Sequence, residues 1–286
     1  MNFGPCGRTL LIDIMPTLRE FKKRIRASKN IASITKAMQL ISVNKVRKSQ
    51  ETTRRNTIYV ENLQEMRGTG SSDSNLGIFK NFVLVLAPQR GLCGSLVNNL
   101  AADLYRKAKL LGPETDYILV GRKAYLWEKY INRKALAFFD FGLSLPTFSK
   151  VRPLTGLVVA KVLESQKASV CILYPKFYSF QKVESTYEPL YPLKTPGSLP
   201  EDFLTDEDPN RITRDLDLYY LEGIIYQKVL EAYLSENAAR MVAMLKASQN
   251  AQELNQDLTL IYNKQRQKEV TTEIIELKGG VASDRR

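Results

Sequence analysis

Two stretches at the ends of the chain carry a long helical pattern of apolar positions. Neither Gly nor Pro occurs between Thr17 and Arg67, and Thr17 with Glu20 three residues later forms a capping-box start. We therefore predict a helix over residues 16–67, about 75 Å long, ended by a linker of small polar residues at 68–77. Apolar side chains recur mostly three or four residues apart in it, at Leu18, Phe21, Ile25, Ile31, Ile34, Met38, Ile41 and Val46.

The second stretch is longer. Asp208 and Pro209 make a good helix start, no Pro occurs from residue 210 to residue 278, and Gly223 is the one glycine there. This pattern predicts a helix over residues 208–280, about 105 Å long, stopped by Gly279 and Gly280. Helices of such length need a partner helix. We therefore expect the two to form an antiparallel coiled coil in which the longer helix overhangs the shorter.

Between them, residues 78–200 alternate short apolar runs with amphipathic stretches. Strands are predicted at residues 82–87, 117–121, 135–141 and 168–174, with an edge strand at 182–188. Helices are predicted at residues 95–111, 122–131 and 151–164. Such alternation favours right-handed crossovers and a mostly parallel sheet. The predicted fold class is α/β, a central Rossmann-like domain flanked by two long helices.

Composition narrows the chemistry. The chain has 286 residues, a net charge of +12 and no histidine, which excludes histidine-based nucleophilic catalysis and imidazole metal ligands. Its three cysteines, Cys6, Cys93 and Cys171, are far apart in the sequence, so neither a zinc cluster nor a disulfide framework is predicted. We expect a reducing compartment, no metal and no cofactor. Residues 1–14 are expected to be an N-terminal extension.

The positive charge is concentrated in one element. Residues 17–55 contain twelve Lys or Arg against Glu20 and Glu51, a net +10. Such a helix attracts an anionic partner: a phosphate backbone, an anionic lipid or an acidic protein surface. A merely solvated basic face is the alternative.

Four features of the sequence are candidates for chemistry. The turn containing Gly91 and Gly94 follows a strand and opens a helix, where α/β proteins bind phosphates. It matches no phosphate-loop motif, so a structural turn is the preferred interpretation. Cys93 in that turn is interpreted as a packed, inert thiol. Arg240 lies among small apolar residues and needs a carboxylate or amide partner. Glu273 and Glu276 lie on a polar helix end, without the pattern of a catalytic pair.

Four sequence motifs in a fixed order point to one protein family. Residues 34–38 (ITKAM), 90–94 (RGLCG), 235–244 (SENAARMVAM) and 270–276 (VTTEIIE), the last followed by Gly279 and Gly280, stand in this order. In these residues the chain resembles the gamma subunit of F-type ATP synthase, over nearly the whole length from Met15 to Ser283. Val281, the segment 42–44 and the end Asp284–Arg286 depart from the family pattern. These departures concern how the tip of the helix pair would fit its partners and leave the implied role unchanged.

The resemblance implies a central rotor shaft that couples proton or ion flow through a membrane ring to ATP synthesis and hydrolysis. It implies a non-catalytic subunit, one copy bound to three alpha and three beta subunits, with the epsilon subunit and the c-ring as further partners and no nucleic acid. The implied location is peripheral, on the cytoplasmic face of the inner membrane of a bacterium. The residues implied to contact the collar or hold the shaft are Lys36, Met38, Arg240, Gln267, Thr271 and Glu273.

The sequence leaves two alternative functions open. A nucleic-acid-binding protein would use the basic helix to neutralise phosphates, although that helix has few aromatic residues. A nucleotide-using enzyme would rest only on the α/β region and the turn at Gly91 and Gly94.

Overall fold

The computed structural model describes residues 17–67, 80–112, 114–131, 133–165, 168–193 and 209–283. The expected extension at 1–14 and the whole predicted linker at 68–77 therefore lie outside the described residues, as do Asp208 and the tail after Ser283. The described chain divides into two compact units, one of residues 17–37 with 246–283 and one of residues 38–245.

Two long helices dominate the chain: α1 (Leu18–Arg67) and α6 (Pro209–Ser283). The predicted capping box starts α1, because the Glu20 carboxylate accepts from the Thr17 N–H at 3.1 Å and the Glu20 N–H donates to the Thr17 hydroxyl at 3.4 Å. Against expectation, α6 does not stop at Gly279 and Gly280 but continues to Ser283.

In the smaller unit the two helices are joined by side chains that bond to main-chain carbonyls. The Ser28 hydroxyl donates to Ala251 O at 2.7 Å, and the Asn255 amide donates to Ile25 O at 2.8 Å. Partners that ascend along α1 descend along α6, so the pair is antiparallel. Ser28 and Ala251 are buried, and their small side chains let the two backbones approach closely.

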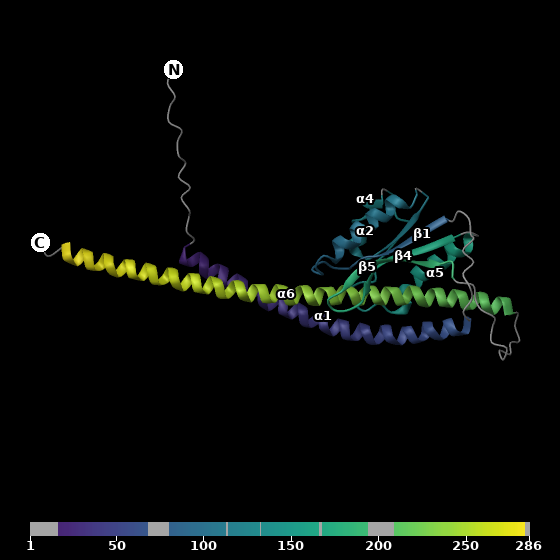
Figure 1. The fold of residues 1–286 in the computed structure, drawn as a ribbon, viewed down its shortest axis with the longest axis horizontal. Helices are drawn as coiled ribbons and strands as arrows, with labels where there is room; N and C mark the ends of the chain where they lie inside the picture. The colour runs from purple at the N-terminus through teal and green to yellow at the C-terminus, as the bar shows by residue number, and fades with distance from the viewer. Residues whose placement is uncertain are drawn as a thin grey trace, which may run out of the picture. The chain divides into compact units, whose positions relative to one another are not determined.

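The larger unit continues the antiparallel pairing. The Asn56 amide donates to Gly223 O at 3.3 Å, and further along α1 the buried Arg67 guanidinium pairs with Asp217 at 2.5 Å. Figure 1 shows α1 and α6 running side by side in this unit.

A five-stranded sheet forms the centre of the larger unit, in the order β3-β2-β1-β4-β5. The strands β1, β2, β3 and β4 are parallel, and β5 is antiparallel to β4. They span Lys80–Leu86, Asp116–Val120, Ala137–Phe139, Ala168–Phe177 and Val183–Tyr191. The connecting helices are α2 (Leu96–Leu110), α3 (Arg122–Tyr125), α4 (Glu128–Ile131) and α5 (Phe148–Glu164).

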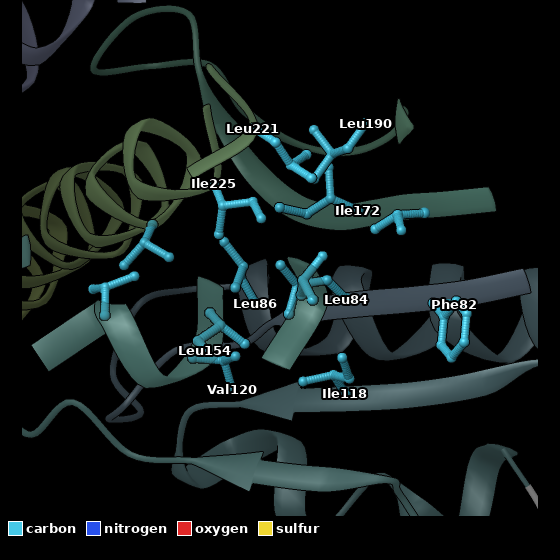
Figure 2. Close-up of a cluster of buried hydrophobic side chains, with 14 of the residues drawn as sticks. Phe82, Leu84, Leu86, Ile118, Val120, Leu154, Ile172, Leu190, Leu221 and Ile225 are labelled. Atoms are coloured by element: carbon cyan, nitrogen blue, oxygen red, sulfur yellow. The ribbon is translucent and has the colours of Figure 1, made fainter. Parts of the chain in front are cut away.

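Both faces of the sheet are buried, as the continuous apolar runs of its inner strands require. On one face Leu84 and Leu86 of β1 meet Leu154 of α5 and Leu221 and Ile225 of α6 (Figure 2). On the other face Val83 and Val85 pack with Leu100 and Leu104 of α2. Ala124 of α3, Ile131 of α4 and Trp127 between these two short helices complete that cluster. One long helix thus serves both as half of the helix pair and as a cover for the sheet.

The predicted fold class is confirmed: two long terminal helices pack against each other, and a mostly parallel sheet stands between them in sequence. Three local predictions need correction. The helix expected over 122–131 is two short helices, because tight turns end α3 and return the chain at Leu126 and Trp127. The strand expected over 135–141 covers only Ala137–Phe139, since the Asp140 carboxylate then accepts from the Gly142 N–H at 2.8 Å and turns the chain. Helix α5 begins at Phe148 and contains Pro153.

Candidate functional site

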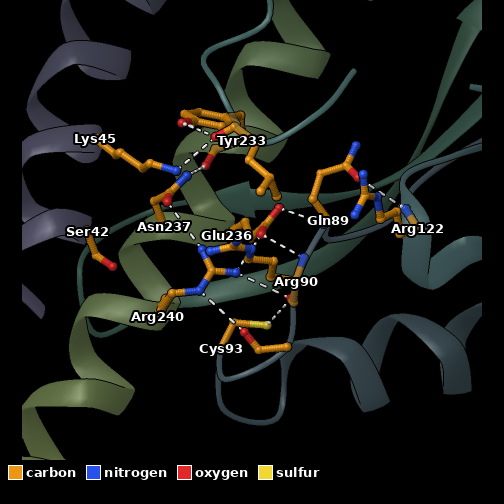
Figure 3. Close-up of polar contacts among 12 residues, drawn as sticks. Ser42, Lys45, Gln89, Arg90, Cys93, Arg122, Tyr233, Glu236, Asn237 and Arg240 are labelled. Carbon is orange, nitrogen blue, oxygen red and sulfur yellow. Dashed lines mark hydrogen bonds and ion pairs between the residues drawn. The ribbon is translucent and has the colours of Figure 1, made fainter. Parts of the chain in front are cut away.

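The loop after β1 is held by a carboxylate from α6. Glu236 accepts from the backbone N–H of Gln89 at 2.9 Å and from that of Arg90 at 3.2 Å (Figure 3). Its side chain is almost completely buried. In nucleotide-binding α/β proteins the loop following the first strand presents its amides to a phosphate. Here the chain's own carboxylate takes these amides, which argues against nucleotide binding at this loop.

Arg240 lies one turn further along α6 and contacts the same loop. We call the contact of Glu236 and Arg240 with the loop after β1 the joint. As predicted, it has a carboxylate and an amide partner: Glu236 at 2.5 Å and the Asn237 carbonyl oxygen at 3.2 Å. The same guanidinium donates to the carbonyls of Arg90 and Gly91, each at 3.3 Å. Because the buried guanidinium is shared among these groups, we interpret Arg240 as the residue that fixes the loop to α6.

Helix α1 places Lys45 close to Glu236 and Arg240. Its ammonium donates to Leu143 O at 2.8 Å, and the Tyr233 hydroxyl donates to the same carbonyl at 3.4 Å. Burial, and then the charges of Arg240 and Arg90, lower the pKa of Lys45, with Glu236 opposing them. Burial raises the pKa of Tyr233. Positive charge is therefore crowded at this junction.

A cavity of about 380 Å³ opens beside the joint. Its walls come from three elements: Met38, Ile41, Ser42 and Lys45 of α1, Arg90, Gly91 and Leu92 of the loop, and Asn237 and Arg240 of α6. Met38 is half-buried, whereas Ile41 and Leu92 are 57% and 62% exposed. Cations stand beside exposed apolar side chains, a combination that suits the side chains of an acidic partner.

The glycines of the turn differ in what they do. Gly94 has φ +62°, a conformation that favours glycine. Gly91 has room for a side chain, and its contribution is the carbonyl that Arg240 contacts. Leu92 between them has φ +63° and bears that strain at an exposed position. Sequence reasoning missed Gly121 (φ +96°), where a Cβ would lie 2.2 Å from Ala87 O.

Cys93 is buried in the turn. Its Sγ lies 3.7 Å from Arg90 O. Burial raises the pKa of the thiol, with Arg240 lowering it and Glu236 raising it. Because the thiolate is the reactive form, these positions support the interpretation of Cys93 as an inert, packed thiol.

The other residues singled out from the resemblance lie in the smaller unit. Lys36 is exposed on α1, and Gln267, Thr271 and Glu273 are exposed on α6. The Thr271 hydroxyl donates to Gln267 O within its own helix at 2.7 Å. Within the described part of the chain, the structure does not bring these α6 residues to α1. Their expected part in holding the helix pair is therefore not seen here.

Sequence reasoning also missed the acceptors of the joint. Glu236 and Asn237 stood inside a recognised motif without an assigned role. The available signal was Glu236 itself, an acidic residue four positions before Arg240 in a run of small side chains, since such pairs face each other on a helix.

Among the described helices, none combines the length and the apolarity that crossing a membrane requires.

These features define a class of protein: a pair of long antiparallel helices, one of which packs on an α/β sheet and is joined to the loop after β1 by buried polar side chains. The ATP synthase family model matches residues 17–283. The chain is 30% identical over 290 residues to an ATP synthase gamma chain of Chloroflexus aurantiacus, covering 94% of this chain and 99% of that one. It is 31% identical over 292 residues to the ATP synthase gamma chain of a Roseiflexus species, with the same coverage.

Solved structures agree in fold. A chain of the Euglena gracilis mitochondrial ATP synthase, in a structure of OSCP, F1 and the c-ring, matches with a TM-score of 0.67 at 18% identity, covering 93% of this chain and 94% of that one. A chain from a rotor structure of the same enzyme matches with a TM-score of 0.61 at 17% identity, covering 88% and 98%. The chain belongs to the ATP synthase gamma-chain family.

Proposed function

We propose that the chain is the central rotor shaft of an F-type ATP synthase, a non-catalytic subunit that couples ion flow through a membrane ring to ATP synthesis and hydrolysis. The observation that carries the proposal is the far part of α6. The last described bond to α1 joins Asn255 to Ile25, yet α6 continues to Ser283. Along this part Val270, Ile274, Ile275 and Leu277 are 46–70% exposed. Apolar side chains gathered on an exposed helix end call for a partner surface.

The proposed partners follow from the family. One copy of the chain would stand inside a collar of three alpha and three beta subunits, with the epsilon subunit and the c-ring at its α/β domain. The complex would be peripheral, at the cytoplasmic face of a bacterial inner membrane. Support comes from the gamma chains of bacteria that this sequence matches, and from neighbours whose structures contain F1 and the c-ring.

The shaft would act by shifting populations. An asymmetric shaft contacts the three catalytic subunits differently, so each orientation favours an open or a closed state at each site. By linkage, nucleotide binding and hydrolysis bias the shaft angle in return. The shaft then needs no catalytic residue, cofactor or metal of its own.

Specific residues take separate parts in this proposal. Lys36 and Met38 would lie near the lever of the catalytic subunit, and the basic cavity beside Met38 suits an acidic lever. Gln267, Thr271 and Glu273 would contact the upper collar, consistent with their exposure. Arg240 would act by holding the loop after β1 on α6.

The test is co-expression of the chain, with an affinity tag, together with the alpha and beta subunits of its source. Native mass spectrometry of the purified material should give one copy of the chain with three of each larger subunit, together with ATPase activity. The alpha and beta subunits expressed without the chain are the control. A lone monomer would contradict the proposal, and a monomer that co-purifies with nucleic acid in a salt-dependent manner would favour the basic-helix alternative.

A further inference from the structure

A second polar joint links α6 to the far edge of the sheet, well away from the loop after β1. Lys228 of α6 donates to the Glu188 carboxylate of β5 and to the Tyr174 hydroxyl of β4, both at 2.7 Å. Lys176 of β4 donates to the other oxygen of Glu188 at 2.9 Å. The Tyr174 hydroxyl also donates to Glu188 at 3.1 Å. One lysine on the helix thus binds two neighbouring strands.

The joint is shielded and balanced in charge. The Lys228 side chain is 16% exposed, and Glu231, one turn along α6, lies 3.9 Å from its ammonium. Burial alone would raise the pKa of Glu188, but the hydrogen bonds from Lys228 and Lys176 hold it at about 2. Burial raises the pKa of Glu231, opposed by the same two lysines. The two cations therefore face two carboxyl groups.

Beside these polar contacts, a large part of the contact between α6 and this face of the sheet is apolar. Leu221, Ile225 and Val229 pack into the core formed by β1, β2, β4 and α5. Apolar burial resists separation but has no preferred direction, so it resists sliding of a helix over a sheet only through side-chain interlocking. Charged hydrogen bonds, in contrast, are short and directional. Lys228 therefore adds to the apolar contact a directional bond at the β4–β5 edge, apart from the one that Glu236 and Arg240 make to the loop after β1.

We propose that Lys228 is a positioning residue that prevents slip between α6 and the sheet when torque passes between them. The proposal rests on the rotor function proposed above and adds the place where the load crosses from the α/β domain into the shaft. Tyr174 and Glu188 are its anchors on the sheet. A lysine with no role beyond folding stability would leave rotation under load unchanged once the complex has assembled.

The experiment uses the complete complexes. Lys228→Met keeps an unbranched side chain one atom shorter and removes the charge, whereas Lys228→Arg keeps the charge. Glu184→Gln is the matched control because its pair with Lys182 on the same edge is exposed. Each variant is assembled with alpha and beta subunits and, separately, into the membrane-bound enzyme. Two quantities are measured: angular fluctuation of a bead on the α/β domain, and ATP-driven proton pumping against an increasing gradient.

For Lys228→Met we expect unloaded ATP hydrolysis to stay near the wild-type rate, because no torque then crosses the α/β domain. The angular variance of the bead should rise, because the charged hydrogen bonds that hold α6 at this edge are lost, and pumping should stall at a lower gradient. Lys228→Arg should recover most of the stall gradient, and Glu184→Gln should match the wild type.

Wild-type fluctuation and a wild-type stall gradient in assembled Lys228→Met would overturn the proposal. If Lys228→Met does not assemble, Glu188→Gln replaces it under the same criteria, since it removes the acceptor charge and keeps the lysine. Failure of the wild-type chain to form an active complex would refute the rotor function instead, so the two ideas fail separately.

Discussion

Glu236 and Arg240 form an ion pair in which each side chain is 8% exposed, inside a set of hydrogen bonds to backbone groups. Such a pair contributes little compared with apolar replacements, but losing one partner strands the other. Its value at this position is geometric, because it fixes where the loop after β1 lies on α6.

Arg240→Met should therefore destabilise the chain strongly. We expect a loss of about 3 kcal/mol in the free energy of unfolding, because the Glu236 carboxylate would remain buried without its cation. Urea denaturation of the isolated chain measures it. Arg55→Met is the control, since the pair of Arg55 with Glu51 is 76% and 63% exposed and should cost less than about 1 kcal/mol. Equal losses in the two variants would contradict the interpretation of the joint.

Glu188 makes the unfolding free energy depend on pH in acid. Its folded pKa of about 2 lies below the unfolded value of about 4.3, so its contribution is complete above that value. The contribution is lost as the pH falls from about 4.3 towards 2. The stability difference between the wild type and Glu188→Gln should shrink by about 1 kcal/mol between pH 6 and pH 2.5, allowing for solvent screening.

The measurement is urea denaturation at a series of pH values. Glu184→Gln on the same strand should give a profile parallel to that of the wild type. A Glu188→Gln profile that also runs parallel would show that Lys228 and Lys176 do not stabilise the ionised carboxylate.

Residue-level roles were only partly readable from the sequence. The need of Arg240 for a carboxylate or amide partner followed from its apolar neighbours, and the structure supplies both. The bond from Glu236 to the Gln89 amide joins residues 147 positions apart, so no local pattern could indicate it. Lys228 was missed because an isolated lysine on a long helix has the appearance of a solvated side chain.

At the scale of elements, the long helices were the most predictable part of the chain. Fifty residues without Gly or Pro leave the helix α1 little alternative. The short elements were less predictable because single contacts decide their ends. Asp140 closes β3 by accepting from Gly142, and tight turns separate α3 from α4. The predicted end of α6 was wrong because Gly279 and Gly280 were expected to stop the helix. The helix continues through both glycines to Ser283.

Two truncations of α6 should differ in how much they affect the stability of the chain. Deleting residues 271–286 removes described side chains that are all exposed, so the free energy of unfolding of the isolated chain should change by less than about 0.5 kcal/mol. Deleting residues 246–286 also removes Ala251 and Asn255, the partners of Ser28 and Ile25. Residues 18–37 should then lose their protection from hydrogen exchange.

Hydrogen exchange followed by mass spectrometry distinguishes the two truncations. Retained protection of residues 18–37 after the longer deletion would show that this part of α1 does not depend on α6.

For the whole molecule, charge distribution governs how partners approach. Nearly all of the net charge of +12 belongs to residues 17–55, and Arg19, Lys22, Lys23 and Arg26 are exposed there. Long-range attraction of this kind accelerates encounter without requiring a fixed partner for each cation. It therefore suits a helix that must leave each contact in turn.

Changing those four cations to Gln should slow association with the alpha and beta subunits about tenfold at low ionic strength. The difference should vanish in about 0.5 M salt because the charges are then screened. Stopped-flow assembly measures the rate. The control changes four exposed cations of the larger unit, Lys109, Lys129, Lys134 and Lys150, to Gln. An equal slowing in the control would mean that net charge rather than its location directs the encounter.

The carboxylate that occupies the loop after β1 has a consequence over time. A bound phosphate is exchangeable: it binds, is cleaved or replaced, and dissociates. The loop around it changes conformation each time it dissociates. The Glu236 anion is covalently part of α6 and cannot depart. We therefore expect the loop to keep one conformation whatever binds nearby. A loop that binds an exchangeable anion in other α/β proteins thus has a permanent partner in Glu236.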